Sequence, residues 1–316
     1  MRAVIETSGL RKAYGAHVAV EGLDLEVGRG DVFGLLGPNG AGKTTTIRML
    51  TTLLAPSAGT ARVCGFDIAT NAREVRRRLG YVMQTVAYRG LLTGREWVEI
   101  EACLYHVPRR DVHRKAEEAL GAVGLLPDAD RRWTEYSGGM KKRLDLACGL
   151  LHSPEVLVLD EPTLGLDVQS RHRVWDYVRE QRDRGATILL ATNYLDEADR
   201  LCNRVAIIDR GVLVVEGSPA SLKRSVGADV LQVRSGAPER LRRAISGERW
   251  IKDMVMSESG DLHVYVEDAS LALPAVMRIG LEHGIELERL TYSQPSLDDV
   301  FLRHTGHELR ETEVAS

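Results

Sequence analysis

The stretch "GPNGAGKTTT" (Gly37–Thr46) decides the fold. It matches the pattern G-x-x-x-x-G-K-[ST] in full, and it stands between an apolar stretch (31–37) and a helix-like stretch that begins at Lys43. Glycines let the backbone curl so that N–H groups and the positive end of the helix face an anion. A glycine-rich turn that carries a lysine by chance is the alternative, and it leaves the flanking strand and helix unexplained. The predicted phosphate-binding residues are Gly37, Pro38, Asn39, Gly40, Ala41, Gly42, Lys43, Thr44 and Thr45.

The composition is that of a soluble globular protein. Of the 316 residues 44% are apolar and 28% are charged, and the net charge is −3, so no basic field attracts nucleic acid. The basic run at 73–80 is expected to be a solvated helix face. Apolar runs such as 186–192 are far shorter than the ~20 residues that span a bilayer, and the N-terminus lacks the apolar core of a signal peptide. We therefore expect a cytosolic protein that does not bind nucleic acid.

Apolar strands alternate with helices through the first two thirds of the chain. Strand patterns at 155–162, 185–193 and 204–211 indicate a parallel sheet that is covered on both faces. The region from about 92 to 130 is more polar and helical, and Thr93 and Glu96 have the spacing of a capping box. The pattern changes at 225–228, and the tail then reads as a small α+β domain.

An acidic pair follows a buried strand. In "VLVLDE" four apolar residues place Asp160 and Glu161 at the carboxyl end of the strand, where open α/β sheets bind ligands. Asp160 is then suited to hold Mg²⁺ beside Thr44, while Glu161 orients or deprotonates the attacking water. The alternative is a solvated strand end, which the apolar approach disfavours.

A second phosphate-binding segment lies at "YSGGM" (136–140). Ser137, Gly138 and Gly139 precede a helix, and their N–H groups suit a terminal phosphate. With this set of motifs the chain resembles the ATP-binding cassette (ABC) ATPases over about residues 1–220. The resemblance implies a head-to-tail dimer in which each ATP lies between the glycine loop of one copy and the Ser137–Gly139 segment of the other.

The resemblance also implies functional roles for three further residues. Tyr14 matches the aromatic residue that stacks on adenine, with a surface turn tyrosine as the alternative. Gln84 matches the glutamine that contacts Mg²⁺ and the attacking water and that reports to the membrane subunit. Asp167 matches the aspartate at the dimer interface; it also suits a helix N-cap, and both roles are compatible.

Two positions depart from the family pattern. The chain has "YSGGM" where most relatives have "LSGGQ", and Asn193 stands where the family usually has a histidine that touches the γ-phosphate. We expect Asn193 to belong to the catalytic group with Glu161 and Gln84. An amide donates hydrogen bonds but carries no charge and shuttles no proton, so a slow, regulatory ATPase is one alternative function.

Three stretches narrow the resemblance. "YSGGMKKRLDLA", "ATNYLDEADRLCNRVAIIDRG" and "QPSLDDVFLRHTG" together are similar to the daunorubicin-resistance type of ABC exporter. This implies ATP-driven efflux of a hydrophobic drug or antibiotic through a separate permease, at the cytoplasmic face of the membrane. A motor for lipid or peptide cargo is a further alternative.

The resemblance also implies the architecture. We expect an α/β P-loop NTPase cassette at 1–225, with a mixed core sheet, an antiparallel β subdomain and a helical subdomain at about 90–137. A small α+β domain of ferredoxin-like type is expected at 226–316, where it acts as an accessory or dimer-contact element or as structural support.

The charge of Lys43 is expected to contribute strongly to ATP binding. Lys43→Ala removes a charge-assisted interaction worth about 1.5–3 kcal/mol, so ATP binding or turnover should fall about 10- to 100-fold or more. Nucleotide titration and steady-state ATP hydrolysis measure the loss. Unchanged hydrolysis would reject the role of Lys43.

Overall fold

Two compact units make up the chain, seen in a computed structural model that describes residues 3–84 and 90–308. One unit ends at Leu213 and the other begins at Val214, whereas the sequence predicts a boundary at 225/226. The division falls earlier because helix α8 (Pro219–Val226) packs against α11 (Leu297–Thr305) of the second unit. Arg303 Nη1 also donates to the carbonyl oxygen of Ser225 at 2.7 Å.

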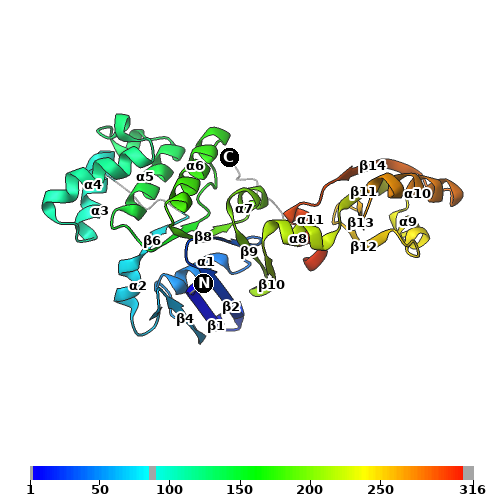
Figure 1. Cartoon of the computed structure of the whole chain (residues 1–316), viewed down its shortest axis with the longest axis horizontal. Coiled ribbons are helices and arrows are strands. Elements are labelled where there is room, and N and C mark those ends of the chain that lie inside the picture. Colours follow the sequence, from blue (N-terminus) through cyan, green and yellow to red (C-terminus); the bar gives the residue numbers. More distant parts are fainter. Residues whose placement is uncertain (1–2, 85–89, 309–316) are drawn as a thin grey trace. The chain divides into compact units, whose positions relative to one another are not determined.

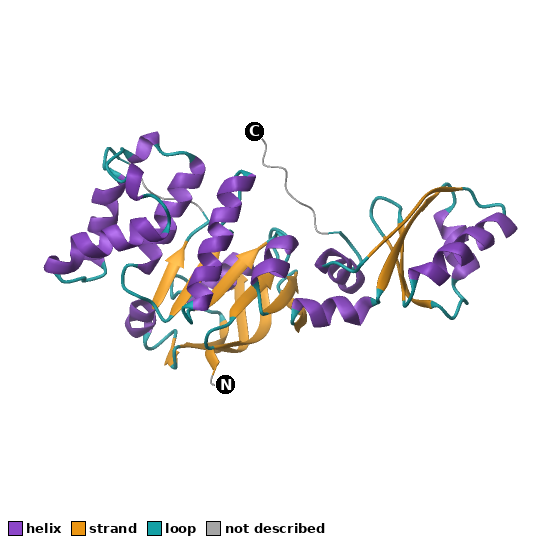
Figure 2. Ribbon diagram, turned by 45° about the horizontal axis from the view of Figure 1, so that its top comes forward, coloured by secondary structure: helices purple, strands orange, loops and turns teal. Residues whose placement is uncertain are grey.

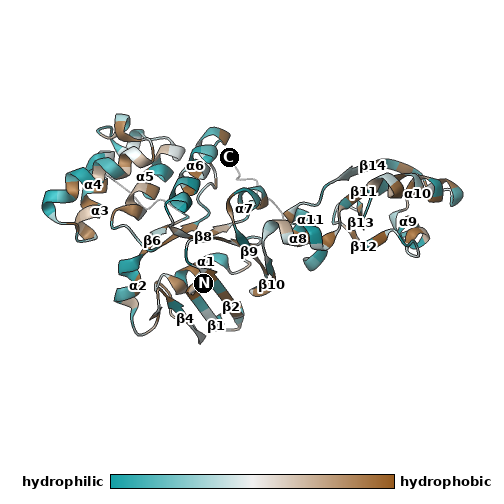
Figure 3. Ribbon diagram, in the orientation of Figure 1, coloured by the Kyte–Doolittle hydropathy of each residue, from teal (hydrophilic) through white to brown (hydrophobic). Residues whose placement is uncertain are grey.

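A six-stranded sheet forms the centre of the first unit (Figure 1), and its edge strand β10 runs across the division at Leu213/Val214. Its order is β10-β9-β3-β8-β7-β6, and every pair from β9 to β6 is parallel. Strands β3, β7 and β8 are buried along their whole length, as in parallel sheets with both faces covered. Figure 3 shows hydrophobic colouring in the sheet around β8. The strands are β3 (Val32–Leu36), β6 (Leu79–Val82), β7 (Val156–Asp160), β8 (Thr187–Thr192), β9 (Arg204–Asp209) and β10 (Val212–Gly217).

A second, antiparallel sheet has the order β2-β1-β4-β5. Its strands are β1 (Ala3–Tyr14), β2 (His17–Gly28), β4 (Ala58–Val63) and β5 (Phe66–Asp67). Strand β1 is absent from the sequence-based expectations, although its last residue is the predicted adenine-stacking Tyr14. Irregular register between β1 and β2 accounts for this, because it breaks the strict alternation that marks a strand in sequence.

Helices α3, α4 and α5 pack against one another beside β6 (Figures 1 and 2), and α3 and α4 fall within the range 90–137 that the sequence predicts as a helical subdomain. The capping box of α3 is present, because Thr93 Oγ1 accepts from the Glu96 N–H and Glu96 Oε2 accepts from the Thr93 N–H. No helix in the described part of the chain is long and apolar enough to cross a bilayer. The helices of this unit are α1 (Lys43–Leu50), α2 (Ala72–Arg78), α3 (Gly94–Leu104), α4 (Arg109–Ala122), α5 (Gly138–Leu150), α6 (Val168–Asp183) and α7 (Leu195–Leu201).

The second unit is an α+β domain with its own core. Its antiparallel sheet has the order β12-β13-β11-β14, and the chain order β-α-β-β-α-β is that of ferredoxin-like folds. Besides α8 and α11, its elements are β11 (Asp229–Ser235), α9 (Pro238–Ile245), β12 (Ile251–Met256), β13 (Leu262–Val266), α10 (Ala269–Glu282) and β14 (Leu287–Ser293). The predicted fold class, an α/β cassette with a small α+β domain, is confirmed.

A glycine permits the close approach of α5 to the central sheet. A Cβ added at Gly80 in β6 would overlap the carbonyl oxygen of Gly149 in α5. We expect Gly80→Ala to lower the free energy of unfolding of this unit by about 1–3 kcal/mol, because the backbone must shift. Urea unfolding measures the change.

The matched control is Gly121→Ala in α4, where an added Cβ meets no atom within 4 Å. This substitution should leave stability unchanged or raise it by up to about 1 kcal/mol. Equal stability of the two variants would contradict the proposed contact.

Candidate active site

The glycine loop joins β3 to α1 and has the backbone that its sequence predicts. Gly42, the N-cap of α1, has φ of 103°, and a Cβ there would lie 2.5 Å from the carbonyl oxygen of Ala19. Gly40 has φ of 83° and faces open space. Only glycine adopts these conformations without strain, so the loop can present its N–H groups and the helix end to an anion.

One pocket of about 420 Å³ lies over this loop. It brings together predicted residues from four separate parts of the chain, namely Tyr14, the loop, Gln84 and Glu161. The side chain of Tyr14 is 49% exposed, as a residue that stacks on a ligand must be. The lining residues are Tyr14, His17, Ala19, Pro38, Asn39, Gly40, Gly42, Lys43, Thr44, Thr45, Gln84 and Glu161.

Lys43 and Glu161 form a buried ion pair in this pocket. Lys43 Nζ lies 3.2 Å from Glu161 Oε1 and donates to the carbonyl oxygens of Gly37 (2.7 Å) and Pro38 (3.2 Å). Glu161 has φ of 48°, in the left-handed region that is costly for a residue with a side chain. Burial raises the pKa of Glu161, and the charge of Lys43 partly opposes the shift.

Asp160 lies behind the loop and is fully buried. Its Oδ1 accepts from Thr44 Oγ1 at 3.2 Å, and its Oδ2 accepts from the Tyr81 hydroxyl at 3.4 Å. Burial raises the pKa of Asp160, whereas the hydrogen bonds from Thr44 and Tyr81 lower it. The pairing of Thr44 with Asp160 fits the predicted cation site. Sequence reasoning missed Tyr81, since a tyrosine on an apolar strand carries no signal of its partner.

Asn193 follows β8 and contacts the predicted base through its backbone. Its N–H donates to Glu161 Oε2 at 3.2 Å. Its side chain is buried, and the amide oxygen has no hydrogen-bond partner among the described residues. The Asn193 segment therefore orients Glu161 and keeps one polar atom available to a ligand.

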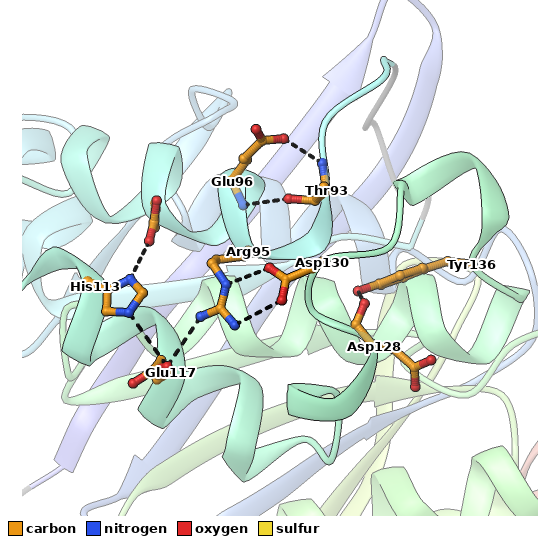
Figure 4. A network of polar contacts seen from close by, with 9 residues as sticks. Thr93, Arg95, Glu96, His113, Glu117, Asp128, Asp130 and Tyr136 are labelled. Carbon is orange, nitrogen blue, oxygen red and sulfur yellow. Dashed lines mark hydrogen bonds and ion pairs between the residues drawn. The ribbon is translucent and has the colours of Figure 1, made fainter.

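The Ser137–Gly139 segment lies apart from this pocket. Ser137 caps α5 by accepting from the Met140 N–H at 3.2 Å, and Ser137 and Gly138 are exposed. Tyr136 is buried, and its hydroxyl donates to the carbonyl oxygen of Asp128 at 2.8 Å (Figure 4). This bond fixes the entry to α5 and gives the side chain of Tyr136 a structural role.

Asp167 is the N-cap of α6, as one interpretation of the sequence predicts. Its carboxylate accepts from the N–H (2.9 Å) and the hydroxyl (2.8 Å) of Ser170, and the Ser170 backbone hydrogen bond is the main cause of its lowered pKa. A Cβ at Gly139 would overlap Ser170 Oγ, so α5 and α6 begin side by side. The interface role of Asp167 stays a prediction.

The residues present fit a nucleotide phosphate and a divalent cation. Lys43 and the loop N–H groups supply positive charge and donors for phosphate. Thr44, Asp160 and Gln84 supply the oxygen ligands that Mg²⁺ prefers. The buried amide oxygen of Asn193, which lacks a partner among the described residues, is a further sign that a ligand completes the site.

Two segments of the chain match known protein families. Residues 20–164 match the family described as ABC transporter, and residues 217–305 match the C-terminal domain of the DrrA1-3-like ATP-binding proteins. The two matches correspond to parts of the two units that the structure separates.

Named relatives resemble the chain over nearly its whole length. It is 43% identical to the daunorubicin/doxorubicin resistance ATP-binding protein DrrA of Streptomyces peucetius, over 99% of this chain and 96% of the relative. It is 40% identical to the Nod factor export ATP-binding protein I of Paraburkholderia xenovorans, over 98% and 99%. A solved ATP-binding subunit of an ABC transporter superposes with a TM-score of 0.64 at 30% identity, over 70% of this chain and 92% of that one.

The raised pKa of Glu161 predicts an acid limb in the pH profile. If Glu161 accepts a proton from water, it must be ionised, so kcat/KM for ATP should rise with pH through a pKa above the ordinary glutamate value of about 4.3. Steady-state hydrolysis across pH measures the limb, and circular dichroism checks that the protein stays folded.

Glu161→Gln is the control for this limb, because it separates the titration of Glu161 from that of ATP. Its residual activity should lack the limb. An inflection at or below 4.3 in the unmodified protein would contradict the raised pKa.

Proposed function

Because the chain belongs to the family of ABC transporter ATP-binding subunits, which bind and hydrolyse ATP, we propose that it powers an exporter. The cargo is a hydrophobic drug, antibiotic or similar compound, and it leaves through a separate membrane permease. A drug-resistance protein at 43% identity over nearly the whole chain supports this cargo class. The protein then works at the cytoplasmic face of the membrane.

One observation carries the proposal. A single pocket joins the glycine loop, Lys43, Thr44, Gln84 and Glu161, while the second phosphate-binding segment lies outside it. Such a site holds ATP by its phosphates and places a carboxylate beside them. Thr44, Gln84 and Asp160 are the residues that would hold Mg²⁺, which neutralises phosphate charge when bound.

The protein residues divide the work of hydrolysis. Lys43 binds the phosphate oxygens, for which it leaves the carbonyl oxygens of Gly37 and Pro38 that it contacts in this structure. Glu161 accepts a proton from the water that attacks the γ-phosphorus, and the bond to the leaving ADP oxygen breaks. The Asn193 N–H holds the second oxygen of Glu161 and so orients the carboxylate.

The position of α5 supports a head-to-tail dimer with a second copy. Ser137 and Gly138 are exposed at the positive end of the helix and do not line the pocket of their own chain. In the dimer they face the γ-phosphate held by the partner copy. ATP then bridges the two copies, and hydrolysis releases them.

Exposed apolar side chains on α3 and directly before Gln84 support docking to a permease. Ile100 and Leu104, one turn apart on α3, are 40% and 68% exposed, and Met83, directly before Gln84, is 39% exposed. Apolar side chains of this size at the surface favour a protein partner. A cytoplasmic segment of the permease that covers Met83 would let Gln84 report on the partner.

Asn193 supports a second candidate function, a regulatory ATPase with slow turnover. Its amide cannot supply the charge of the usual histidine. Steady-state hydrolysis with and without a permease distinguishes the two functions, because a transport motor accelerates when its permease is present.

The proposal predicts that Glu161→Gln binds ATP and dimerises but barely hydrolyses it. Loss of a general base lowers the rate about 10²–10⁴-fold. Light scattering with saturating Mg-ATP should then show a dimer that disappears without nucleotide.

The control is Ser137→Arg in the same variant, which should bind ATP and stay monomeric. If Glu161→Gln remains monomeric with Mg-ATP, both alone and beside a permease, the proposed ATP-dependent dimer is wrong.

A further inference from the structure

A buried lysine on α5 contacts the segment that carries Gln84. Lys142 is 5% exposed, and its Nζ donates to the carbonyl oxygen of Met83 at 2.6 Å. Among the described residues, no other side chain hydrogen-bonds the backbone of Met83 or Gln84. A charged donor to a carbonyl is stronger than a neutral one, so Lys142 is a main determinant of where this segment lies.

The contact joins the helix at the proposed dimer interface to the residues beside the chain's own ATP pocket. Lys142 stands five residues after Ser137, in the helix whose first turn faces the partner copy in the proposed dimer. Met83 directly precedes Gln84, which lines the pocket for the chain's own ATP. Both Met83 and Gln84 are exposed and follow the end of β6, so the backbone hydrogen bonds of the sheet do not fix their position.

The surroundings of Lys142 are acidic and shielded from water. Burial lowers the pKa of Lys142, and the charges of Asp145, Asp160 and Glu161 oppose the shift. A buried ammonium is costly unless it is paired and hydrogen-bonded. The contact therefore tolerates little movement of α5 relative to the Gln84 segment.

We propose that Lys142 is a positioning residue that ties the Gln84 segment to α5. The proposal rests on the proposed function. Because of this tie, the position of Gln84 depends on the position of the helix that meets the second copy. Engagement of the partner's ATP at Ser137 is thereby connected to the chain's own hydrolysis site. Lys142 does not line the pocket over the glycine loop, so it acts through Gln84.

The test compares Lys142→Met with Lys141→Met. The neighbouring Lys141 places its Nζ 4.2 Å from the centre of the Trp133 ring, away from Met83, so its variant removes the same charge without touching the tie. We expect Lys142→Met to lower kcat about tenfold with KM for ATP nearly unchanged. Lys141→Met should keep kcat, and Lys142→Arg, which retains a donor, should recover part of the loss.

A double-mutant cycle with Gln84→Ala separates positioning from general stability. If Lys142 acts through Gln84, the double variant is no slower than Gln84→Ala alone, whereas independent losses multiply. Thermal unfolding shows whether Lys142→Met folds. If it does not, Lys142→Arg replaces it in the cycle, and its kcat is compared with and without Gln84→Ala. Multiplying losses, or a wild-type kcat in Lys142→Met, would overturn the proposal.

Dimerisation with Mg-ATP tests the proposed function separately from the proposed role of Lys142. Lys142→Met combined with Glu161→Gln should still dimerise with Mg-ATP. If Glu161→Gln alone stays monomeric, the function is wrong; if it dimerises and Lys142→Met turns over normally, only the role of Lys142 is wrong.

Discussion

The buried ion pair between Lys43 and Glu161 is the contact on which the site depends. It joins the helix after β3 to the end of β7, although β8 lies between these strands in the sheet. Both side chains are almost fully buried, so each compensates the charge of the other. Glu161 has a left-handed backbone conformation at the end of β7. The charge of the phosphate-binding Lys43 and that of the proposed base Glu161 therefore neutralise each other in this structure.

The first two turns of helix α5 carry residues that point in different directions. Its exposed first turn presents Ser137 and Gly138, whereas Lys142, just over one turn further, reaches inward to Met83. Tyr136 and the Asp128 carbonyl fix the entry to the helix, and Gly149 allows its far end to approach β6. A rigid helix held at both ends can transmit a displacement, which a flexible loop with the same residues could not.

Contiguous motifs were predictable from sequence because their geometry is local. The loop from Gly37 to Thr45, the capping box of Thr93 and Glu96, and the caps at Ser137 and Asp167 each depend on residues a few positions apart. Alternating apolar strands and helices also indicated the parallel sheet, which places Glu161 and Asn193 at one edge. The fold class followed from these patterns. Strand β1 did not, because its register with β2 is irregular.

The sequence by itself thus determined the chemistry that is available: a phosphate loop, a carboxylate pair and a second helix end that suits an anion. Only the tertiary structure decided which groups meet. Lys142 and Met83 are 59 positions apart, and Tyr81 and Asp160 are 79 apart. The unit boundary was likewise set by the packing of α8 on α11. A local pattern cannot encode such contacts, because they exist only once the chain has brought distant segments into hydrogen-bonding distance.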